Sequence, residues 1–229
     1  MNVRYFDNAA TTRVKDEVLE EMLPYLKEKF GNPSSMYTIG REAKKAIENA
    51  RERVAKLINC KANEIYFTGS GSESDNTAIK GIAHKRAFKG KHIITSKIEH
   101  PAVLHTCQSL EREGFKVTYL NVNRDGIVDI NQLINSIRND TILISIMYAN
   151  NEIGTIQPIK EIGEIAHKHG VLFHTDAVQA YGQIPISVDE CHIDMLSASG
   201  HKLNGPKGVG FLYIRTGVKI RSFVHGGQQ

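Results

Sequence analysis

Short apolar runs rich in β-branched residues alternate along the chain with longer stretches whose apolar positions recur every three or four residues. The first pattern predicts buried strands and the second predicts helices with one apolar face. Predicted strands cover 65–68, 92–96, 117–122, 142–148, 171–174, 195–198 and 209–214. Predicted helices between them cover 73–86, 102–113, 130–137 and 159–169, the last with Pro158 as its first position. Strands separated by helices pair in parallel, so we expect a three-layer α/β/α fold around a mostly parallel sheet of about seven strands.

The first part of the chain carries only the helical pattern. It predicts helices over 14–30 and 41–58, joined by a loop at 31–35. We therefore expect an N-terminal arm over 1–12 and one large domain over 13–229. After the last predicted strand the chain ends without a further helix, so we expect the large domain to be incomplete at its C-terminal end.

Composition narrows the function classes. With 41% hydrophobic and 24% charged residues, the chain has the balance of a globular protein. Its 29 basic and 25 acidic residues are interspersed, without the basic stripe of a nucleic-acid binder. No apolar run could cross a membrane and the N-terminus has no signal-peptide pattern, so we expect a cytoplasmic protein. Three cysteines without CxxC spacing argue against disulfides and against a cysteine zinc site.

Candidate chemistry follows the strands, because ligands of open parallel sheets bind beyond the carboxyl ends of the strands. A Gly/Ser-rich loop after the first strand opens a helix, where backbone amides would bind an anion and Ser70 or Ser72 could add a hydroxyl donor. The spacing of Ser70 and Glu73 also fits an ordinary capping box, so both interpretations stay open here.

Polar residues follow three further strands. His100 would reach the same crevice, or would only make a structural hydrogen bond. The pair Asn150 and Asn151 would also reach it, or would only form a turn. Asp176 ends an apolar strand, where a buried carboxylate needs a cation or a metal. No third ligand accompanies His174 and Asp176 at a recognisable spacing, so we expect a cationic partner and no metal site.

Lys202 lies among small residues before a Gly/Pro turn, a poor position for a solvated lysine. A nucleophilic lysine must be neutral, and lowering its pKa from ~10.4 to near 7 costs about 4–5 kcal/mol. Covalent attachment to a carbonyl would account for that cost. A Schiff-base lysine, a strand-end aspartate and a Gly/Ser anion loop together describe a pyridoxal 5'-phosphate site, in which the aspartate keeps the ring nitrogen protonated.

This set of motifs resembles the cysteine desulfurases, a class V branch of the fold-type I pyridoxal phosphate enzymes, over essentially the whole chain. The motifs that carry the resemblance lie at 5–12, 31–35, 68–76, 99–100, 150–154, 174–179 and 199–202. The resemblance implies the major domain of a pyridoxal-phosphate-dependent transferase, a homodimer, and a separate small C-terminal domain that this chain lacks.

The resemblance also implies residue roles. Lys202 would form the Schiff base, Asp176 would bind the pyridine nitrogen, and His100 would stack on the ring and act beside Lys202 in catalysis, with proton transfer as a further role. Gln179 would lie near the ring hydroxyl, and Asn151 would contact cofactor or substrate, with Asn150 as the alternative. The residues expected around the phosphate are Gly71, Ser72, Ser199 and His201.

The implied reaction converts L-cysteine to L-alanine. A thiolate attacks the substrate sulfur, and the resulting persulfide supplies iron–sulfur cluster and thio-cofactor assembly through a scaffold or other acceptor protein. The family's persulfide cysteine and carboxylate-binding arginine lie in the C-terminal part, and Cys60, Cys107 and Cys191 do not match that cysteine. We expect this chain to hold much of the cofactor site without completing the reaction alone.

Two other interpretations stay open at this point. One is a selenocysteine lyase or another class V enzyme, which the C-terminal part of the family would distinguish. The other is a non-catalytic or split partner that completes its site with a second polypeptide.

Overall fold

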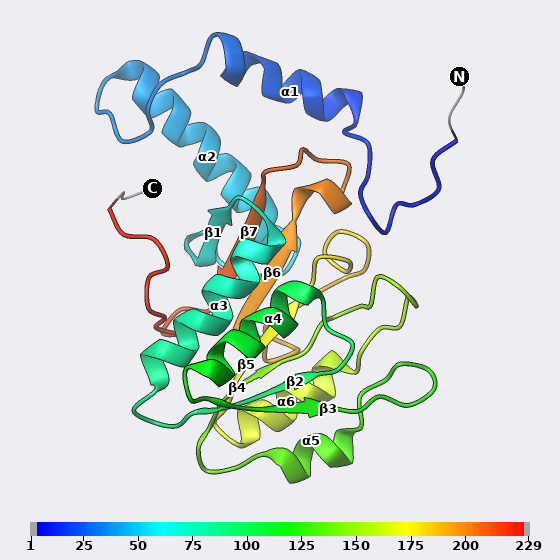
Figure 1. Ribbon diagram of the computed structural model, residues 1–229. Coiled ribbons are helices and arrows are strands. Elements are labelled where there is room, and N and C mark those ends of the chain that lie inside the picture. The colour runs from blue at the N-terminus through cyan, green and yellow to red at the C-terminus, as the bar shows by residue number, and fades with distance from the viewer. Residues whose placement is uncertain (1–3, 227–229) are drawn as a thin grey trace.

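A seven-stranded sheet forms the centre of the chain, whose computed structural model describes residues 4–226 (Figure 1). The strands are β1 (Ile65–Thr68), β2 (His92–Ser96), β3 (Lys116–Leu120), β4 (Thr141–Ser145), β5 (Leu172–Asp176), β6 (Met195–Ser199) and β7 (Gly210–Ile214). Their order across the sheet is β1-β7-β6-β5-β4-β2-β3. Only β7 runs against its neighbours, since it pairs antiparallel with both β1 and β6. The predicted mostly parallel sheet is therefore confirmed.

Six α-helices and two short 3-10 turns connect and precede the strands in the described part of the chain. The helices are α1 (Asp16–Lys27), α2 (Thr38–Lys56), α3 (Gly71–Arg86), α4 (Pro101–Arg112), α5 (Ile130–Ser136) and α6 (Ile159–Lys168). The 3-10 turns are η1 (Ala62–Glu64) and η2 (Gly200–Lys202). Every helix and strand predicted from periodicity is present, with ends that move by a few residues.

Two of these differences have a local cause. The strand predicted to extend to residue 148 ends at Ser145 as β4, but the N–H groups of Ile146 and Tyr148 still donate hydrogen bonds to carbonyl groups of β5. The extended chain therefore continues past the strand toward the pocket edge. Pro158 precedes α6 as its cap residue and is not its first helical position, because its ψ of 63° lies outside the helical region.

Both faces of the sheet are buried, which explains why the strands read as continuous apolar runs. Neighbouring residues of one strand enter different cores: Ile93 and Leu143 pack with α3 and α4, whereas Ile94 and Ile144 pack against α5 and α6. The same alternation continues in β5 and β6. Two hydrophobic cores on opposite faces thus hold the sheet rigid, with its carboxyl edge free to carry side chains.

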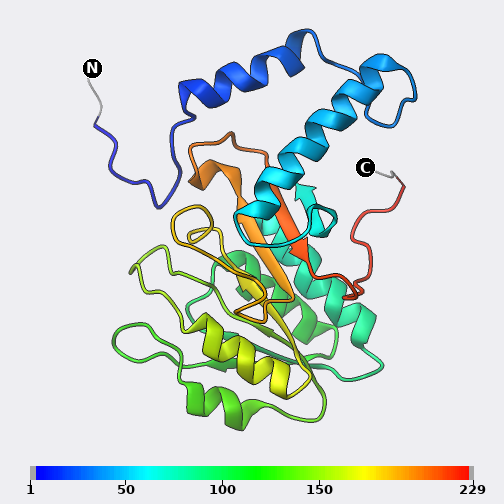
Figure 2. The same cartoon turned by 180° about the vertical axis from the view of Figure 1, so that it is seen from behind.

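The first two helices differ from the others. In both views α1 and the beginning of α2 extend away from the sheet, and only the end of α2 reaches it (Figure 1, Figure 2). α1 contains no buried residue, and its leucines Leu19, Leu23 and Leu26 are exposed. No helix of the described residues is long and apolar enough to span a bilayer. The expectations for residues 1–3 of the arm and 227–229 of the chain end lie outside the described part.

Candidate cofactor site

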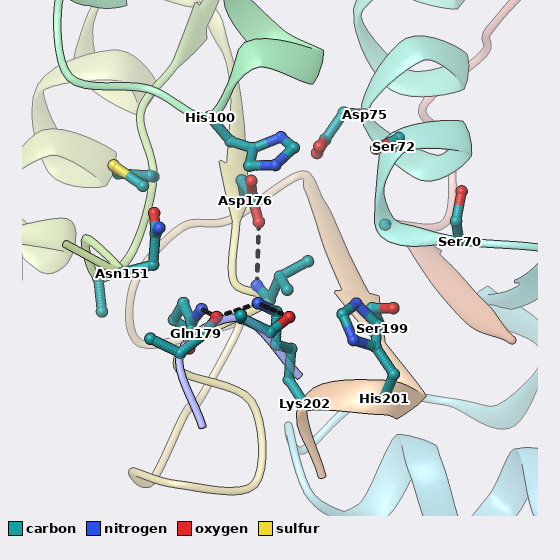
Figure 3. Close-up of a pocket in the computed structure, with 16 residues that line it drawn as sticks. Ser70, Ser72, Asp75, His100, Asn151, Asp176, Gln179, Ser199, His201 and Lys202 are labelled. Carbon is teal, nitrogen blue, oxygen red and sulfur yellow. Dashed lines mark hydrogen bonds between the residues drawn. The ribbon is translucent and has the colours of Figure 1, made fainter. Parts of the chain in front are cut away.

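A pocket of about 310 Å³ lies at the carboxyl edge of the sheet, where the segments after β1, β2, β4, β5 and β6 meet (Figure 3). The N-terminal arm closes one side of it with Ala9 and Ala10. Every site residue singled out from the sequence lines this pocket: Gly71, Ser72, His100, Asn151, Asp176, Gln179, Ser199, His201 and Lys202. The sheet therefore brings together residues that lie up to 131 positions apart in the chain, from Gly71 to Lys202.

The beginning of α3 forms one end of the pocket. Ser70 caps the helix by accepting a hydrogen bond from Glu73 N (3.1 Å), and Glu73 Oε2 accepts one from Gly69 N (2.7 Å). The two interpretations of this loop are thus compatible, because the cap leaves the first helical residues, Gly71 and Ser72, at the pocket wall. A Cβ on Gly71 would lie 2.6 Å from Val178 Cγ2, so the close approach of the helix end requires glycine. This positive helix end suits an anion.

Asp176 ends β5 at the opposite side of the pocket and is 6% exposed. Its Oδ1 accepts a hydrogen bond from Val178 N (2.9 Å). Burial raises the pKa of Asp176 above its ordinary value, and that hydrogen bond and the positive charge of Lys202 oppose the shift. The expected cationic partner is therefore present as the neighbouring charge of Lys202, which forms no ion pair with Asp176 in the described part of the chain.

His100 stands at the beginning of α4 and acts as its cap: its Nδ1 accepts a hydrogen bond from Ala102 N (3.1 Å). A ring nitrogen that accepts a hydrogen bond is unprotonated, so the neutral ring carries its proton on Nε2. The ring lies beside the carboxyl groups of Asp75 and Asp176 (Figure 3). His100 thus has both a structural role as a cap and a position in the pocket.

Lys202 lies in η2, directly after β6, and its side chain reaches the arm. Its Nζ donates hydrogen bonds to the carbonyl groups of Ala9 and Ala10, the latter at 2.9 Å. Burial lowers the pKa of Lys202, and the negative charges of Asp7 and Asp176 oppose that shift. A lysine whose pKa is lowered in a pocket has the electrostatics that a nucleophilic amine needs.

The arm is fixed to the loop that carries Lys202. Thr12 N and Thr12 Oγ1 both donate to the carbonyl of His201 (2.9 and 2.7 Å), and Asn204 N donates to Thr12 Oγ1 (2.7 Å). His201 Nδ1 contacts Thr11 Oγ1 (3.1 Å). Gln179 Nε2 donates to the carbonyl of Ala9 (3.0 Å). The two chain segments therefore form one wall of the pocket although nearly the whole chain separates them.

The two neighbouring asparagines have different positions. Asn151 lines the pocket, half-buried. Asn150 is buried in its own loop, where Oδ1 accepts hydrogen bonds from Glu152 N (2.8 Å) and Ile153 N (3.1 Å), and Nδ2 donates to the carbonyl of Ile98 (3.0 Å). Of the two alternatives, Asn151 is the one that can reach a ligand.

Three buried titratable residues near the pocket were not predicted as parts of it: Asp75, Glu99 and His174. Asp75 follows Gly71 by four positions on α3, so the helical period was a usable signal that both share one face. His174 points into the core, between Ser145 Oγ and Ser197 Oγ (2.9 Å each). His174 and Asp176 share one face of β5, since they lie two positions apart in the strand, but His174 lies one step further from the carboxyl edge and is covered completely.

The carboxylates of Asp75 and Asp176 and one nitrogen of His100 lie within 4.8 Å of one another, whereas His174 is not part of this group. The cysteines lie elsewhere: Cys107 is buried, Cys60 and Cys191 are half-buried, and none of them lines the pocket. Burial raises the pKa of both Cys60 and Cys107 to about 12.

Fold and pocket together define an α/β unit with a helix N-terminus, a lysine and a strand-end aspartate around one cavity. The family model for "Aminotransferase class-V" matches residues 4–229. The chain therefore belongs to the class-V aminotransferase family.

Individual relatives agree with this assignment. A "Cysteine desulfurase IscS" of Methanosarcina thermophila is 63% identical over 225 residues, which cover 98% of this chain and 56% of that protein. A solved "NifS-like protein" has a TM-score of 0.96 at 48% identity, covering 98% of this chain and 62% of its own. The structure titled "SspA in complex with cysteine" also has a TM-score of 0.96, at 47% identity, covering 99% of this chain and 66% of its own. The chain thus spans between about half and two thirds of these relatives.

Proposed function

We propose that this chain is the cofactor-binding part of a pyridoxal 5'-phosphate-dependent cysteine desulfurase, which converts L-cysteine to L-alanine and passes the sulfur to a thiol. One observation carries the proposal: Lys202 Nζ, the carboxylate of Asp176 and the beginning of α3 surround one cavity. The names of the relatives supply the reaction and its substrate.

The charges of the pocket fit this cofactor. Its phosphate would lie at the positive end of α3, near Gly71, Ser72, Ser199 and His201. Its ring nitrogen would face Asp176, and its aldehyde carbon would meet Lys202 Nζ. The pocket thus has the beginning of α3 on one side and Asp176, at the end of β5, on the other. When bound, the cofactor supplies an electron-withdrawing ring that stabilises negative charge at the substrate α-carbon.

The protein side chains then have separate tasks. An ionised Asp176 would favour a proton on the ring nitrogen, and His100, which lines the pocket, would contact the ring. Lys202 Nζ, which donates to the carbonyls of Ala9 and Ala10, would bind the aldehyde of the cofactor. As a free amine it would be the group that accepts the proton from the substrate α-carbon. Asn151 and Gln179 also line the pocket and would contact the cofactor or the substrate.

The proposal is tested by reducing the chain with borohydride in the presence of pyridoxal 5'-phosphate and measuring its intact mass. We expect one cofactor adduct per chain, absent from Lys202→Ala. Lys207→Ala is the matched control, because this exposed lysine lies in the same loop without lining the pocket; it should keep the adduct. An adduct that survives in Lys202→Ala, or none on the parent chain, would contradict the assignment of Lys202.

Two further statements belong to this proposal and rest on the resemblance to cysteine desulfurases. They are assembly as a homodimer and delivery of sulfur to an iron–sulfur scaffold or other acceptor protein. Action in the cytoplasm, expected from the sequence pattern, also belongs to the proposal. We also propose that the described residues 4–226 are the arm and large domain of a longer two-domain enzyme.

A further inference from the structure

Asp75 is the least explained polar residue of the pocket. It is 1% exposed, lies in the first turns of α3 and contributes to the pocket wall. Its Oδ1 has no hydrogen-bond partner among the described residues. A buried ionised carboxylate without a donor is costly, because burial removes its hydration without replacing it.

The surroundings of Asp75 supply little positive charge. His174 Nε2 lies 3.6 Å from Asp75 Oδ1, but this fully buried ring is neutral, since burial lowers the pKa of His174 to about 3. The carboxyl groups of Asp176 and Glu99 face Asp75 and disfavour a further negative charge. His100 and Lys202 act electrostatically on Asp176.

The two carboxyl groups are therefore unequal. Asp176 accepts a backbone hydrogen bond from Val178 N and lies near the ammonium group of Lys202, whereas Asp75 has neither. Two carboxylates in one buried site do not both ionise, and the proton stays with the group whose charge is less stabilised. Burial together with the charge of Asp176 raises the pKa of Asp75 well above its ordinary value, although a hydrogen bond from the side chain of Ser197 opposes this shift.

We propose that Asp75 is a positioning residue for Asp176: a neutral carboxylic acid that turns its hydroxyl toward Asp176 and keeps the single negative charge of the pair there. An oxygen of Asp75 and an oxygen of Asp176 lie within 4.8 Å of each other. Protonation would turn Asp75 from an acceptor with an unpartnered oxygen into a hydroxyl donor that can face Asp176. This role rests on the proposed function, because it places the charge opposite the cofactor's ring nitrogen.

The direct test is the infrared spectrum of the cofactor-free chain at pH 7, where protonated carboxyl groups give a band separate from carboxylates. Asp75→Asn should lose one such component. Glu99→Gln is the matched control: it removes a second buried acid, whose pKa burial raises to about 8, and should leave the Asp75 component in place. A spectrum of Asp75→Asn with the full protonated band would overturn the proposal.

A second measurement uses the dissociation constant of pyridoxal 5'-phosphate. Asp75→Asn, neutral and able to donate, should bind within about threefold of the parent chain, whereas Asp75→Ala should bind about tenfold more weakly. Equal weakening in both variants would mean that Asp75 acts by its charge and would overturn the proposal. If the parent chain binds no cofactor, the proposed function fails instead, and the infrared result still decides the protonation of Asp75.

Discussion

Glu99 illustrates how burial sets charge at the residue scale. Its Oε1 accepts hydrogen bonds from Ser96 Oγ (2.6 Å) and Met147 N (3.0 Å), while Oε2 has no partner among the described residues. These bonds favour the ionised form, but desolvation outweighs them and raises the pKa of Glu99 from 4.5 to about 8. The residue thus joins β2 to β4 directly beside His100, and its charge changes near neutral pH.

This shift predicts a pH-dependent stability. Between about pH 4.5 and 8 the folded chain holds a proton on Glu99 that the unfolded chain has released. The contribution of Glu99 to the free energy of unfolding therefore falls as pH rises through this window and levels off above it, by at most about 5 kcal/mol.

The measurement is urea unfolding of the parent chain and Glu99→Gln between pH 5 and 9. The parent should lose stability relative to the variant as pH rises to about 8, since glutamine keeps an acceptor and does not titrate. A difference between the two that stays constant over this range would show that Glu99 is ionised in the folded state throughout.

At the scale of elements, α6 shows how closely the helices pack. Its buried residues Ile159, Ile162, Gly163 and Ala166 recur at helical spacing and face β5 and the segment before β6. A Cβ on Gly163 would lie 1.9 Å from the carbonyl oxygen of Cys191 and 3.3 Å from Phe173 Cδ1. The helix therefore approaches backbone at a distance that only glycine permits.

Gly163→Ala should lower the free energy of unfolding by about 1–3 kcal/mol. Alanine favours a helix interior by about 1 kcal/mol over glycine, so propensity alone predicts the opposite sign. Glu164→Ala, at the exposed neighbour, should change stability by less than about 0.5 kcal/mol. Both changes in the free energy of unfolding are measured from the denaturant midpoints. A Gly163→Ala chain as stable as the parent would mean that the segment around Cys191 moves to make room for the added methyl group.

At the scale of the whole molecule, the cofactor pocket and the thiols are separate. Cys60 lies against the core between α2 and η1, Cys107 is buried in α4, and Cys191 precedes β6. Burial raises the pKa of all three thiols, which suppresses the thiolate that would attack a sulfur atom. No nucleophile for sulfur transfer therefore faces the pocket among the described residues.

The chain loaded with pyridoxal 5'-phosphate and given L-cysteine should accordingly form no persulfide on Cys60, Cys107 or Cys191. The check is peptide mass spectrometry after alkylation under non-reducing conditions, with the cysteine desulfurase IscS of Methanosarcina thermophila as the positive control. A persulfide on one of these cysteines, lost in its serine variant, would show that this chain carries its own sulfur acceptor.

Sequence predicted the order and type of the elements well because their signals are local. Buried strands and amphipathic helices have different periods, and glycine, proline and capping residues mark their ends. Site residues such as Asp176 and Lys202 were also predictable, since polar residues that follow apolar strands share one edge of a parallel sheet. The reversed direction of β7 has no such local signal.

Only the tertiary structure decided which groups face one another. The arm contacts the loop around Lys202, and Asp75 meets Asp176, although these segments are far apart in the chain. The neighbours Asn150 and Asn151 point in different directions, so that only Asn151 lines the pocket. Their charge states depend on burial and on distances across the pocket, which the order of residues does not contain. The sequence by itself determined the elements, the family and the pocket's chemical groups; the packing of the sheet decided their contacts and protonation.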